Sequence, residues 1–554
     1  MKQKLLSILQ NFTIDLIEEH MIEVPVYEHL GDYSLPCFSF AKKQKKSPFL
    51  IAQDLASRIQ DENIEKVEAI NGYVNIFMKR TSFSDTILNT IRKAGKQYGS
   101  TNLGDGDVVT IDMSSPNIAK PFSMGHLRST VIGNSIALLL EKSGYQPVKI
   151  NHLGDWGTQF GKLLVAYRLW GDKKKIEEAP IQSLLKLYIR FHEEAEKDES
   201  LNDKGRRAFK LLEDGEQDAL ELWDWFRTES LHEFQKIYDL LGVTFDSFHG
   251  EAYYNDKMDP IVEELLQKNL LLESDGALVV DVGENIPPCL IKKSDGATLY
   301  ATRDITAAIH RKKNYHFKKS LYIVGNEQSL HFVQLKSVLN KMGYEWSESL
   351  QHIPFGLILK DGKKLSTRKG KIILLEEVLN EAIQLAERTV EEKNPSLVNK
   401  KEVAKKVGVG AIIFSDLKQH RKHDIDFDLK KMLQTDGETA PYVQYTYARA
   451  CSILRKVQDV DTIDVTVVND FEWKVIKSLQ QFPSIVRRAT DEYDPSLVAK
   501  YSIDLAQSFN SFYGNVHIVN SSSHLPYRIA LVQSVAIVLE EALRLLGIKA
   551  PSEM

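Results

Sequence analysis

The turn Ser123-Met124-Gly125-His126 carries residue types suited to binding phosphate, and it lies between a β-branched run and a long apolar-periodic segment. A helix N-terminus exposes unpaired N–H groups and a partial positive charge, which attract phosphate. Gly125 has no Cβ and admits a phosphate or a flat base close to the backbone. His126 can donate to a phosphate oxygen, and Lys120 adds a flexible cation nearby. In isolation, such a histidine more often caps a helix, so this turn alone does not define a site.

A second segment, "KDGKKLSTRKGK" at 360–371, is a Gly/Lys/Ser-rich loop that follows an apolar run. A triphosphate that loses pyrophosphate needs cations that meet the transition state more strongly than the ground state. A loop that closes on the phosphates can supply that difference. The loop offers the following donors: Lys363, Lys364, Ser366, Thr367, Arg368 and Lys369.

The elements around the first turn alternate between strand and helix. We predict a strand at 108–113, a helix from about 126 to 144 and a strand at 147–154. The pattern resumes with strands at 320–325 and 352–359, after a charged helical insertion at about 162–250. Such alternation predicts an α/β fold with a doubly wound parallel sheet, and ligands bind at the carboxyl ends of its strands.

At 554 residues, the chain is too long for one hydrophobic core, and differences in pattern along the sequence indicate separate domains. Residues 1–85 resemble a small α/β unit, and Gly104-Asp105-Gly106 is a plausible linker to the α/β region at 107–371. Beyond 371 helical periodicity dominates, which predicts a separate helix bundle at the end of the chain.

Composition narrows the class of protein. With 43% hydrophobic and 27% charged residues and no run of about 20 apolar residues, a globular protein without a membrane span is expected. The three cysteines lack Cys-x-x-Cys spacing, which argues against structural zinc or disulfides and fits a reducing cytoplasm. The net charge of −5 neither indicates nor excludes nucleic-acid binding, because local clustering of cations matters more than the sum.

Five motifs in order give the chain a family resemblance. "SMGH" and "KLSTR" resemble the HIGH and KMSKS signatures of class I aminoacyl-tRNA synthetases. "SSPNIAKP" (114–121), "NHLGDWGTQFG" (151–161) and "YATRD" (300–304) are similar to segments of the arginyl-tRNA synthetase family. "YVQYTYARACSILRK" and the terminal "LLGIKAPSEM" resemble its anticodon-binding domain, so the resemblance spans essentially the whole chain.

The resemblance implies a fold and an activity. The expected fold is a Rossmann-type catalytic domain at 107–371, with a tRNA-contacting domain at 1–85, a stem-contacting helical connection at 372–434 and an α-helical anticodon-binding domain at 435–554. The expected activity is ATP-dependent attachment of L-arginine to tRNA(Arg) through an arginyl-adenylate, with Mg²⁺ entering with ATP and no protein-bound metal. The family pattern also implies a cytoplasmic monomer that needs tRNA present before it activates arginine.

Residue by residue, the matching positions carry expected roles. The arginine-binding residues are expected to be Asp112, Ser115, Asn117, Tyr300, Asp304 and Gln328, with Tyr300 and Asp304 reading the guanidinium. ATP binding is expected at Ser123, Gly125, His126, Gly325, Lys363, Lys364, Ser366 and Arg368, and catalysis at Lys120, His126, Lys364 and Ser366. The expected tRNA contacts are Tyr442, Gln444, Tyr445, Tyr447 and Arg449. Purely structural roles remain open for each: Asp304 as a helix cap, and the tyrosines as core residues.

Arginine recognition has a physical consequence for fidelity. The guanidinium is planar and always protonated, so it calls for carboxylates and forked acceptors. A site that hydrogen-bonds a required group rejects analogues that lack it by about 10⁴-fold or more. We therefore expect no editing domain, and the sequence shows no segment large enough to be an obvious one.

Two positions depart from the family signatures. Ser123 replaces the first histidine of the HIGH pattern, and Thr367 stands where the KMSKS pattern has its catalytic lysine. Losing one preorganised donor costs about 3–4 kcal/mol of transition-state stabilisation. Lys120 occupies the place of a lysine that family members lacking the loop lysine carry before the HIGH turn. Our hypothesis is that Lys120 supplies the missing charge.

Three alternatives remain at this point. A non-catalytic RNA-binding relative would explain Ser123 and Thr367, but not the retention of Gly125, His126 and "YATRD". A class I synthetase for another amino acid, such as cysteine, would leave the acidic guanidinium site unexplained. A small-molecule nucleotidyltransferase would not need the helical tail or the N-terminal unit.

Overall fold

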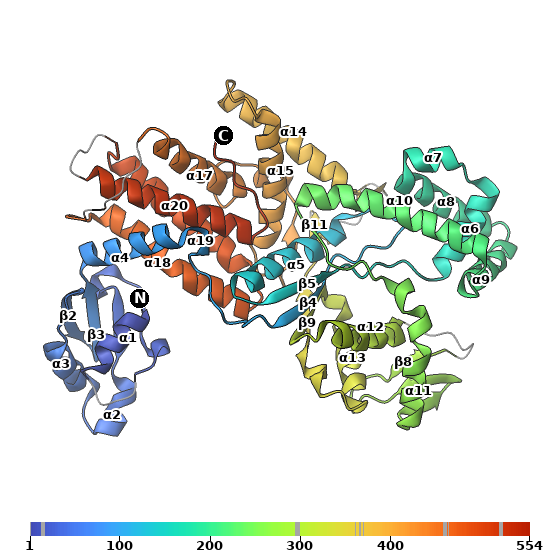
Figure 1. Ribbon diagram of the computed structural model, residues 1–554, viewed down its shortest axis with the longest axis horizontal. Helices are drawn as coiled ribbons and strands as arrows, with labels where there is room; N and C mark the ends of the chain where they lie inside the picture. Colours follow the sequence, from blue (N-terminus) through green and yellow to red (C-terminus); the bar gives the residue numbers. More distant parts are fainter. Residues whose placement is uncertain are drawn as a thin grey trace. The chain divides into compact units, whose positions relative to one another are not determined.

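The computed structural model describes residues 2–12, 17–293, 300–360, 362–364, 367–368, 371–457, 463, 465–519 and 524–554. The chain forms two compact units. The first comprises Met1–Tyr98, Thr446–Pro483 and Asp504–Leu539, and the second comprises Gly99–Tyr445, Ser484–Ile503 and Glu540–Met554. Figure 1 labels the elements along the chain.

The first unit contains a three-stranded antiparallel sheet of order β1-β3-β2 at the start of the chain. Val74 and Ile76 of β3 are fully buried, and Asn75 between them is buried as well, as fits the central strand of this sheet. The elements before residue 98 are α1 (Lys2–Gln10), β1 (Tyr33–Pro36), α2 (Phe38–Gln44), α3 (Pro48–Arg58), β2 (Ile64–Ile70), β3 (Tyr73–Met78) and α4 (Arg80–Ala94), with 3-10 turns at Glu19–Met21, Glu28–Leu30 and Gly95–Gln97.

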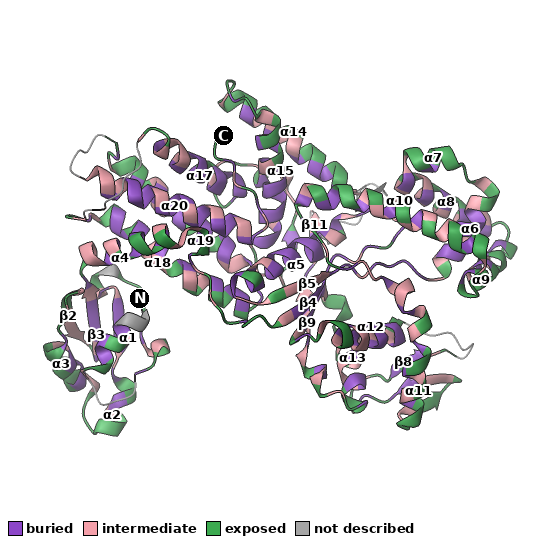
Figure 2. Ribbon diagram, in the orientation of Figure 1, coloured by how far each residue is buried: buried purple, intermediate pink, exposed green. Residues whose placement is uncertain are grey.

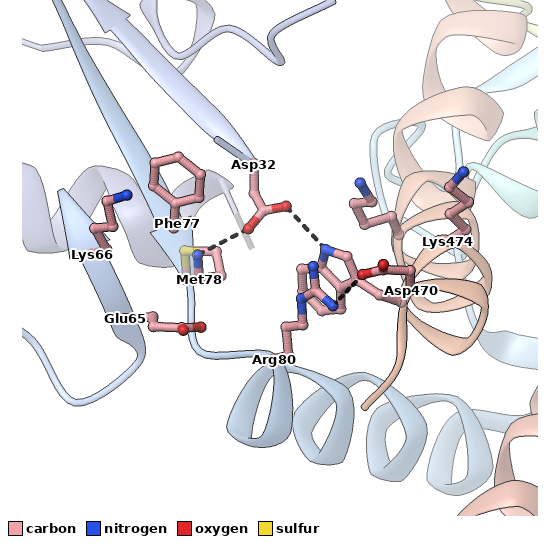
Figure 3. A pocket seen from close by; sticks show the side chains of 10 residues that line it. Asp32, Glu65, Lys66, Phe77, Met78, Arg80, Asp470 and Lys474 are labelled. Atoms are coloured by element: carbon pink, nitrogen blue, oxygen red, sulfur yellow. Dashed lines mark hydrogen bonds and ion pairs between the residues drawn. The ribbon is translucent and has the colours of Figure 1, made fainter. Parts of the chain in front are cut away.

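A pocket of about 400 Å³ lies in this unit between the end of β3 and the first part of α18 (Figure 3). Asp32 accepts hydrogen bonds from the Met78 N–H at 3.0 Å and from the Trp473 indole at 3.2 Å. Arg80 forms an ion pair with Asp470 at 2.7 Å. The partly buried carboxyl of Asp32, whose pKa is raised by burial, thus joins the small sheet to helix α18, whereas the Arg80–Asp470 pair is exposed.

The second unit is built on a four-stranded parallel sheet of order β10-β9-β4-β5 (Figure 1). Chain order reverses between β4 and β9, and such a switch point places a ligand crevice at the carboxyl ends of the strands. The sheet elements are β4 (Val108–Asp112), β5 (Gln146–Ile150), β9 (Lys319–Gly325) and β10 (Leu350–Phe355), and the helices packed on them are α5 (Met124–Lys142), α12 (Tyr300–Tyr315) and α13 (Ser329–Lys341).

Between β5 and β9 the chain forms two further groups of elements. The charged region folds into five helices: α6 (Thr158–Trp170), α7 (Lys173–Glu178), α8 (Pro180–Ala195), α9 (Ser200–Glu213) and α10 (Gln217–Leu241). The segment after it contains α11 (Asp259–Gln267) and the antiparallel strands β6 (Leu271–Ser274), β7 (Ala277–Val280) and β8 (Cys289–Lys292). The sequence pattern did not predict this small sheet.

The strand predicted at 352–359 is confirmed as part of the parallel sheet only as far as Phe355, and its continuation to 359 is wrong. The chain leaves the parallel sheet after Phe355 and enters a separate small sheet as β11 (Ile358–Lys360), which pairs with β12 (Lys363–Lys364) and β15 (Ile425–Asp426). A side chain at Gly356 would collide with the backbone of His423, so the glycine permits this change of direction. The apolar residues on both sides of it read as one continuous strand.

The remaining elements are mostly helical. They are β13 (Thr367–Arg368), β14 (Lys371–Ile372), α14 (Leu375–Lys393), α15 (Lys400–Leu417), α16 (Leu429–Met432), α17 (Ala440–Leu454), α18 (Asp470–Asp491), α19 (Ser496–Asn515) and α20 (Leu525–Leu545). Ile529, Val532, Val535 and Leu539 of α20 are all buried, as their spacing of three and four predicts.

Helix α5 is buried along most of its length (Figure 2). Near its start, Arg128 forms a buried ion pair with Asp416 of α15, with Nε 3.3 Å from Oδ2. At its last turn, Lys142 forms a second buried ion pair with Glu541, with Nζ 2.9 Å from Oε1. Between them, the Ser135 hydroxyl donates to the Leu545 carbonyl at 2.7 Å. The helix is thus held by polar contacts at both ends and at its centre.

Candidate active site

The turn before α5 fixes the state of His126. The Ser123 N–H lies 3.1 Å from His126 Nδ1 and donates to it, so Nδ1 is unprotonated and Nε2 carries the ring proton. Burial lowers the pKa of His126 to about 4, and the charge of Lys120 acts in the same direction. At neutral pH, His126 is therefore an uncharged donor at the N-terminus of α5.

Lys120 lies just upstream in the same loop. Its ammonium is 5.8 Å from the centre of the Tyr188 ring of α8, which is a cation–π distance. The side chain is only partly buried, and its four-carbon stem gives it reach. Gly125 is exposed at the helix start, and its nearest potential contact is Ser123 Oγ, so the backbone there is open to approach.

The loop between β4 and α5 has a strained backbone. Ser114, Ser115 and Ala119 adopt φ values of 72°, 49° and 59°, a region that non-glycine residues rarely occupy. Hydrogen bonds hold this geometry: the Ser114 N–H donates to Ser129 Oγ at 2.8 Å, and the Ala119 N–H donates to Ser230 Oγ at 2.9 Å. Strain of this kind persists where the surrounding structure over-determines it, and it clusters at functional sites.

Asp112 ends β4 and is already engaged at both carboxylate oxygens. Oδ2 lies 2.8 Å from Nη1 of the buried Arg311, and Oδ1 accepts from the Ser115 hydroxyl at 2.9 Å. This arrangement places Asp112 behind Ser115, where it orients the hydroxyl, rather than in an open position of its own. Asn117 in the next turn is exposed.

Asn117 is tied to the "NHLGDWG" segment through Gly154. The two residues form a parallel bridge, and the Gly154 N–H donates to the Pro116 carbonyl at 3.1 Å. A Cβ on Gly154 would overlap the Asn117 amide, so only glycine allows this close approach. Two of the motifs are therefore joined in space.

Asp304 forms the centre of a second group of residues. It lies one turn after Tyr300 on α12, so both side chains share a face of the helix. The His331 Nε2 donates to Asp304 Oδ2 at 2.6 Å, and His152 Nε2 lies 3.7 Å from Oδ1. Burial favours the protonated acid, but the His331 hydrogen bond and the nearby positive charges outweigh it, so the pKa of Asp304 lies below its usual range. Asp304 is a carboxylate at neutral pH.

The other residues predicted to bind arginine and ATP around this sheet edge are more open. Tyr300 is 63% exposed, with the Arg303 guanidinium 5.9 Å from its ring centre. Gly325 ends β9, and Gln328 is exposed in the short 3-10 turn Asn326–Gln328 that follows. Both therefore lie at the carboxyl end of a central strand, which is the position predicted for a ligand.

Three residues of this region were missed by the sequence reading. His152 lies inside the quoted "NHLGDWGTQFG" motif and His331 lies three residues after the predicted Gln328, so their closeness to named residues was an available signal. Glu251 had none: it is brought in by the fold, 3.7 Å from Arg303 Nη1. Burial raises the pKa of Glu251 to about 7, and the charges of Asp304 and Asp155 add to that effect, while Arg303 opposes it.

The loop at 360–371 is only partly described. Its backbone pairs Lys363–Lys364 with β11, and Thr367–Arg368 with β14. Ser366 lies outside the described residues, and so do the side chains of Lys363, Lys364, Thr367 and Arg368. Their predicted roles stay predictions.

Helix α17 presents its predicted tRNA-binding residues unequally. Gln444 is fully buried, and its amide donates to the carbonyls of Lys406 and Lys549 at 3.1 and 2.8 Å, so it links parts of the second unit internally. Tyr447 is also buried, whereas Tyr442 is partly buried and Tyr445 is 38% exposed. The Arg449 guanidinium lies 4.8 Å from the centre of the partly exposed Tyr513 ring.

Metal sites and membrane-spanning helices are both absent from the residues that the structure describes. In that part of the chain, no three His, Cys, Asp or Glu side chains come together as a metal site. Within the same residues, the helices are too short or too polar to span a bilayer.

Comparison with known proteins places this geometry in a family. The catalytic-domain model "tRNA synthetases class I (R)" matches residues 86–429, the arginyl-tRNA synthetase N-terminal model matches residues 1–78, and the DALR anticodon-binding model matches residues 443–554. The fold and the site thus define a class I aminoacyl-tRNA synthetase.

Individual relatives are similar over their whole length. The chain is 54% identical to Arginine–tRNA ligase 1 of Bacillus cereus over 99% of this chain and 98% of that one. It is 56% identical to the Arginine–tRNA ligase of Enterococcus faecalis over 98% and 97%. Among solved structures, Thermus thermophilus arginyl-tRNA synthetase superposes with a TM-score of 0.84 at 26% identity, covering 100% of this chain and 99% of that one. The chain belongs to the arginyl-tRNA synthetase family.

Proposed function

We propose that this arginine–tRNA ligase first joins L-arginine to the α-phosphate of ATP and then transfers the arginyl group to the 3′-terminal adenosine of tRNA(Arg). The observation that carries the proposal is the 54% identity to an arginine–tRNA ligase across 99% of the chain. An ionised Asp304 at the carboxyl end of the parallel sheet supports the choice of a cationic amino acid.

In the activation step, the arginine carboxylate attacks the α-phosphorus in line, and the bond to the leaving pyrophosphate breaks. No covalent enzyme intermediate is needed, so the protein acts by positioning and electrostatics. The His126 Nε2–H donates to a phosphate oxygen, and the Lys120 ammonium compensates the developing negative charge. Lys364 and Ser366 of the loop contribute further donors in this scheme.

Mg²⁺ enters with the nucleotide in this proposal. It prefers six oxygen ligands, keeps several waters and usually binds through substrate phosphates with one or two carboxylates. Such an ion needs no dedicated cluster of protein ligands, and ATP supplies most of its coordination.

Arginine recognition divides between two groups of side chains. Asp304 and Tyr300 read the guanidinium, and Gln328 contacts the substrate from the end of β9. Ser115, oriented by Asp112, and Asn117 hold the α-amino and carboxylate groups. Because the site hydrogen-bonds a charged planar group, it discriminates against analogues that lack this group by about 10⁴-fold or more. An editing domain is therefore unnecessary.

The C-terminal helices read the anticodon loop. RNA recognition favours unstacked bases packed on aromatic side chains and hydrogen-bonded at their edges. Tyr445 and the Arg449–Tyr513 pair are accessible for such contacts. Gln444 and Tyr447 support the helix from within instead. The N-terminal unit contacts the tRNA corner, and the enzyme acts as a monomer in the cytoplasm, with tRNA required before arginine is activated.

ATP–pyrophosphate exchange with arginine, lysine or cysteine, with and without total tRNA, tests this function. We expect exchange with arginine alone among the three, and only when tRNA is present. Exchange with cysteine would identify a different synthetase. Absence of arginyl-tRNA after incubation with ATP, Mg²⁺ and the cognate tRNA would contradict the proposal.

A further inference from the structure

His152 follows strand β5 directly and has a defined ring tautomer. Its Nδ1 lies 3.2 Å from the carbonyl oxygen of His249. A carbonyl oxygen can only accept, so Nδ1 is the donor in this contact, and in the uncharged form of the ring the lone pair is then on Nε2. The ring packs at 5.7 Å from the ring of Tyr254, which limits its rotation.

That lone pair faces the carboxylate of Asp304. His152 Nε2 is 3.7 Å from Asp304 Oδ1, whereas Oδ2 on the other side already accepts from His331. Two acceptors therefore point at the same space, and both side chains are partly accessible, with 13% and 28% of their surface exposed. Two lone pairs so placed repel each other unless a donor lies between them.

The ligand that suits this pair is a cation with N–H groups on separate nitrogens. A guanidinium presents five such donors in one rigid plane, so one nitrogen can donate to Oδ1 while another donates to Nε2. The buried Arg311, which belongs to the protein and pairs with Asp112, shows that the surrounding region already accommodates this group.

We infer that His152 is a specificity-determining residue that accepts a second N–H of the substrate guanidinium beside Asp304. The inference rests on the proposed arginine specificity of the enzyme. His331 already donates to Asp304 Oδ2, which leaves Oδ1 as the available acceptor of that carboxylate. His152 Nε2 provides the second acceptor that a guanidinium needs.

Steady-state aminoacylation of tRNA by His152→Phe and His152→Gln tests this role. His152→Phe keeps an aromatic ring against Tyr254 but has no acceptor, so the arginine KM should rise roughly ten- to hundredfold, as expected for a lost hydrogen bond to a charged group. The ATP KM and kcat should stay within about twofold of the wild type. His152→Gln retains an acceptor oxygen and should recover most of the arginine affinity.

His352→Gln is the matched control, because this histidine is also partly buried but donates to the Val324 carbonyl at 3.0 Å instead of facing Asp304. Its arginine KM should equal that of the wild type.

An unchanged or lower arginine KM in His152→Phe would overturn the inference. A lower KM would mean that His152 is an imidazolium that competes with the substrate. If His152→Phe fails to fold, an arginine KM in His152→Gln above that of His352→Gln by more than about tenfold would also overturn it. A wild-type enzyme that charges no arginine would instead refute the proposed function.

Discussion

His331 Nε2 donates to Asp304 Oδ2 at 2.6 Å, which ties the first turn of α13 to α12. Burial disfavours the charged imidazole, but this hydrogen bond and the charge of Asp304 raise the pKa of His331 above its ordinary 6.5. The same contact lowers the pKa of Asp304. The two groups therefore affect each other: when His331 is charged, it neutralises part of the Asp304 charge that would otherwise attract a substrate cation.

Arginine affinity should depend on pH through His331. Its raised pKa means that the imidazolium forms already above pH 6.5 as pH falls, and that cation competes with the guanidinium for Asp304. The arginine KM should accordingly fall as pH rises through the pKa of His331. In His331→Gln, an uncharged donor replaces the imidazole, and this pH dependence should disappear while kcat stays similar. Initial rates at varied arginine between pH 6 and 9 measure it; an identical profile in the variant would show that His331 does not control the site.

Lys120 should matter more to activation than Thr367. Lys120→Ala removes the charge proposed to meet the pyrophosphate, and the loss of about 3–4 kcal/mol of transition-state stabilisation would slow ATP–pyrophosphate exchange by roughly 10²–10³-fold. Thr367→Ala removes only a hydroxyl and should have a small effect.

Lys162→Ala is a matched control for Lys120→Ala, since Lys162 also lies over an aromatic ring of α8, 5.9 Å from the centre of Phe191. Its exchange rate should stay close to that of the wild type. Comparable, small effects of Lys120→Ala and Thr367→Ala would refute the compensation hypothesis.

Glu251 should make the folded protein less stable at high pH. Its folded pKa of about 7 exceeds the ordinary 4.5, so between these values the unfolded chain loses a proton that the folded chain keeps. The free energy of unfolding therefore decreases as pH rises through that window, by about 3 kcal/mol, and is constant above it. Glu251→Gln should show a smaller drop in Tm between pH 5 and pH 8. The exposed Glu263→Gln should retain the wild-type drop, and an unchanged drop in Glu251→Gln would contradict the assignment.

The buried pair between Arg128 and Asp416 should be costly to break from one side. Burial already raises the pKa of Asp416, and Arg128→Met would leave that carboxyl without its partner. The loss should be about 3–5 kcal/mol of unfolding free energy. Adding Asp416→Leu should recover much of it, although the carbonyls of Arg421 and His423 lose their donor in both variants.

Thermal unfolding followed by circular dichroism compares these variants. Lys173→Met breaks an exposed pair with Glu177 and should cost no more than about 1 kcal/mol. A loss in Arg128→Met no greater than that of Lys173→Met would show that the buried pair contributes little.

Much of the fold and part of the site could be predicted from the sequence. The β-branched run before the Ser123–His126 turn and the long periodic segment after it were sufficient to place β4 and α5. The order of the sheet could not be read, because strand adjacency depends on contacts between distant segments. The break at Gly356 was missed because apolar residues flank it on both sides.

Candidate site residues could be named only where a motif contained them. The resemblance named Asp304 and Asn117, whose roles stay predictions, but the engagement of Asp112 by Arg311 depends on a packing of α12 against β4 that no local pattern reveals. Glu251 comes from a segment without a motif, and only its burial beside Arg303 makes it notable. Gln444 is the reverse case. An amide among tyrosines resembles an RNA contact in the sequence, but in the folded chain this side chain is buried and bonded internally.

The two buried ion pairs of α5 limit what this helix can do. Turning the helix about its axis, or sliding it along that axis, would separate Arg128 from Asp416 and Lys142 from Glu541 in a medium where unpaired charges are costly. The imidazole of His126, at the start of α5, is consequently held in one position throughout a catalytic cycle. Any adjustment that incoming reactants require has to come from other parts of the molecule, with α5 as the stationary reference against which they move.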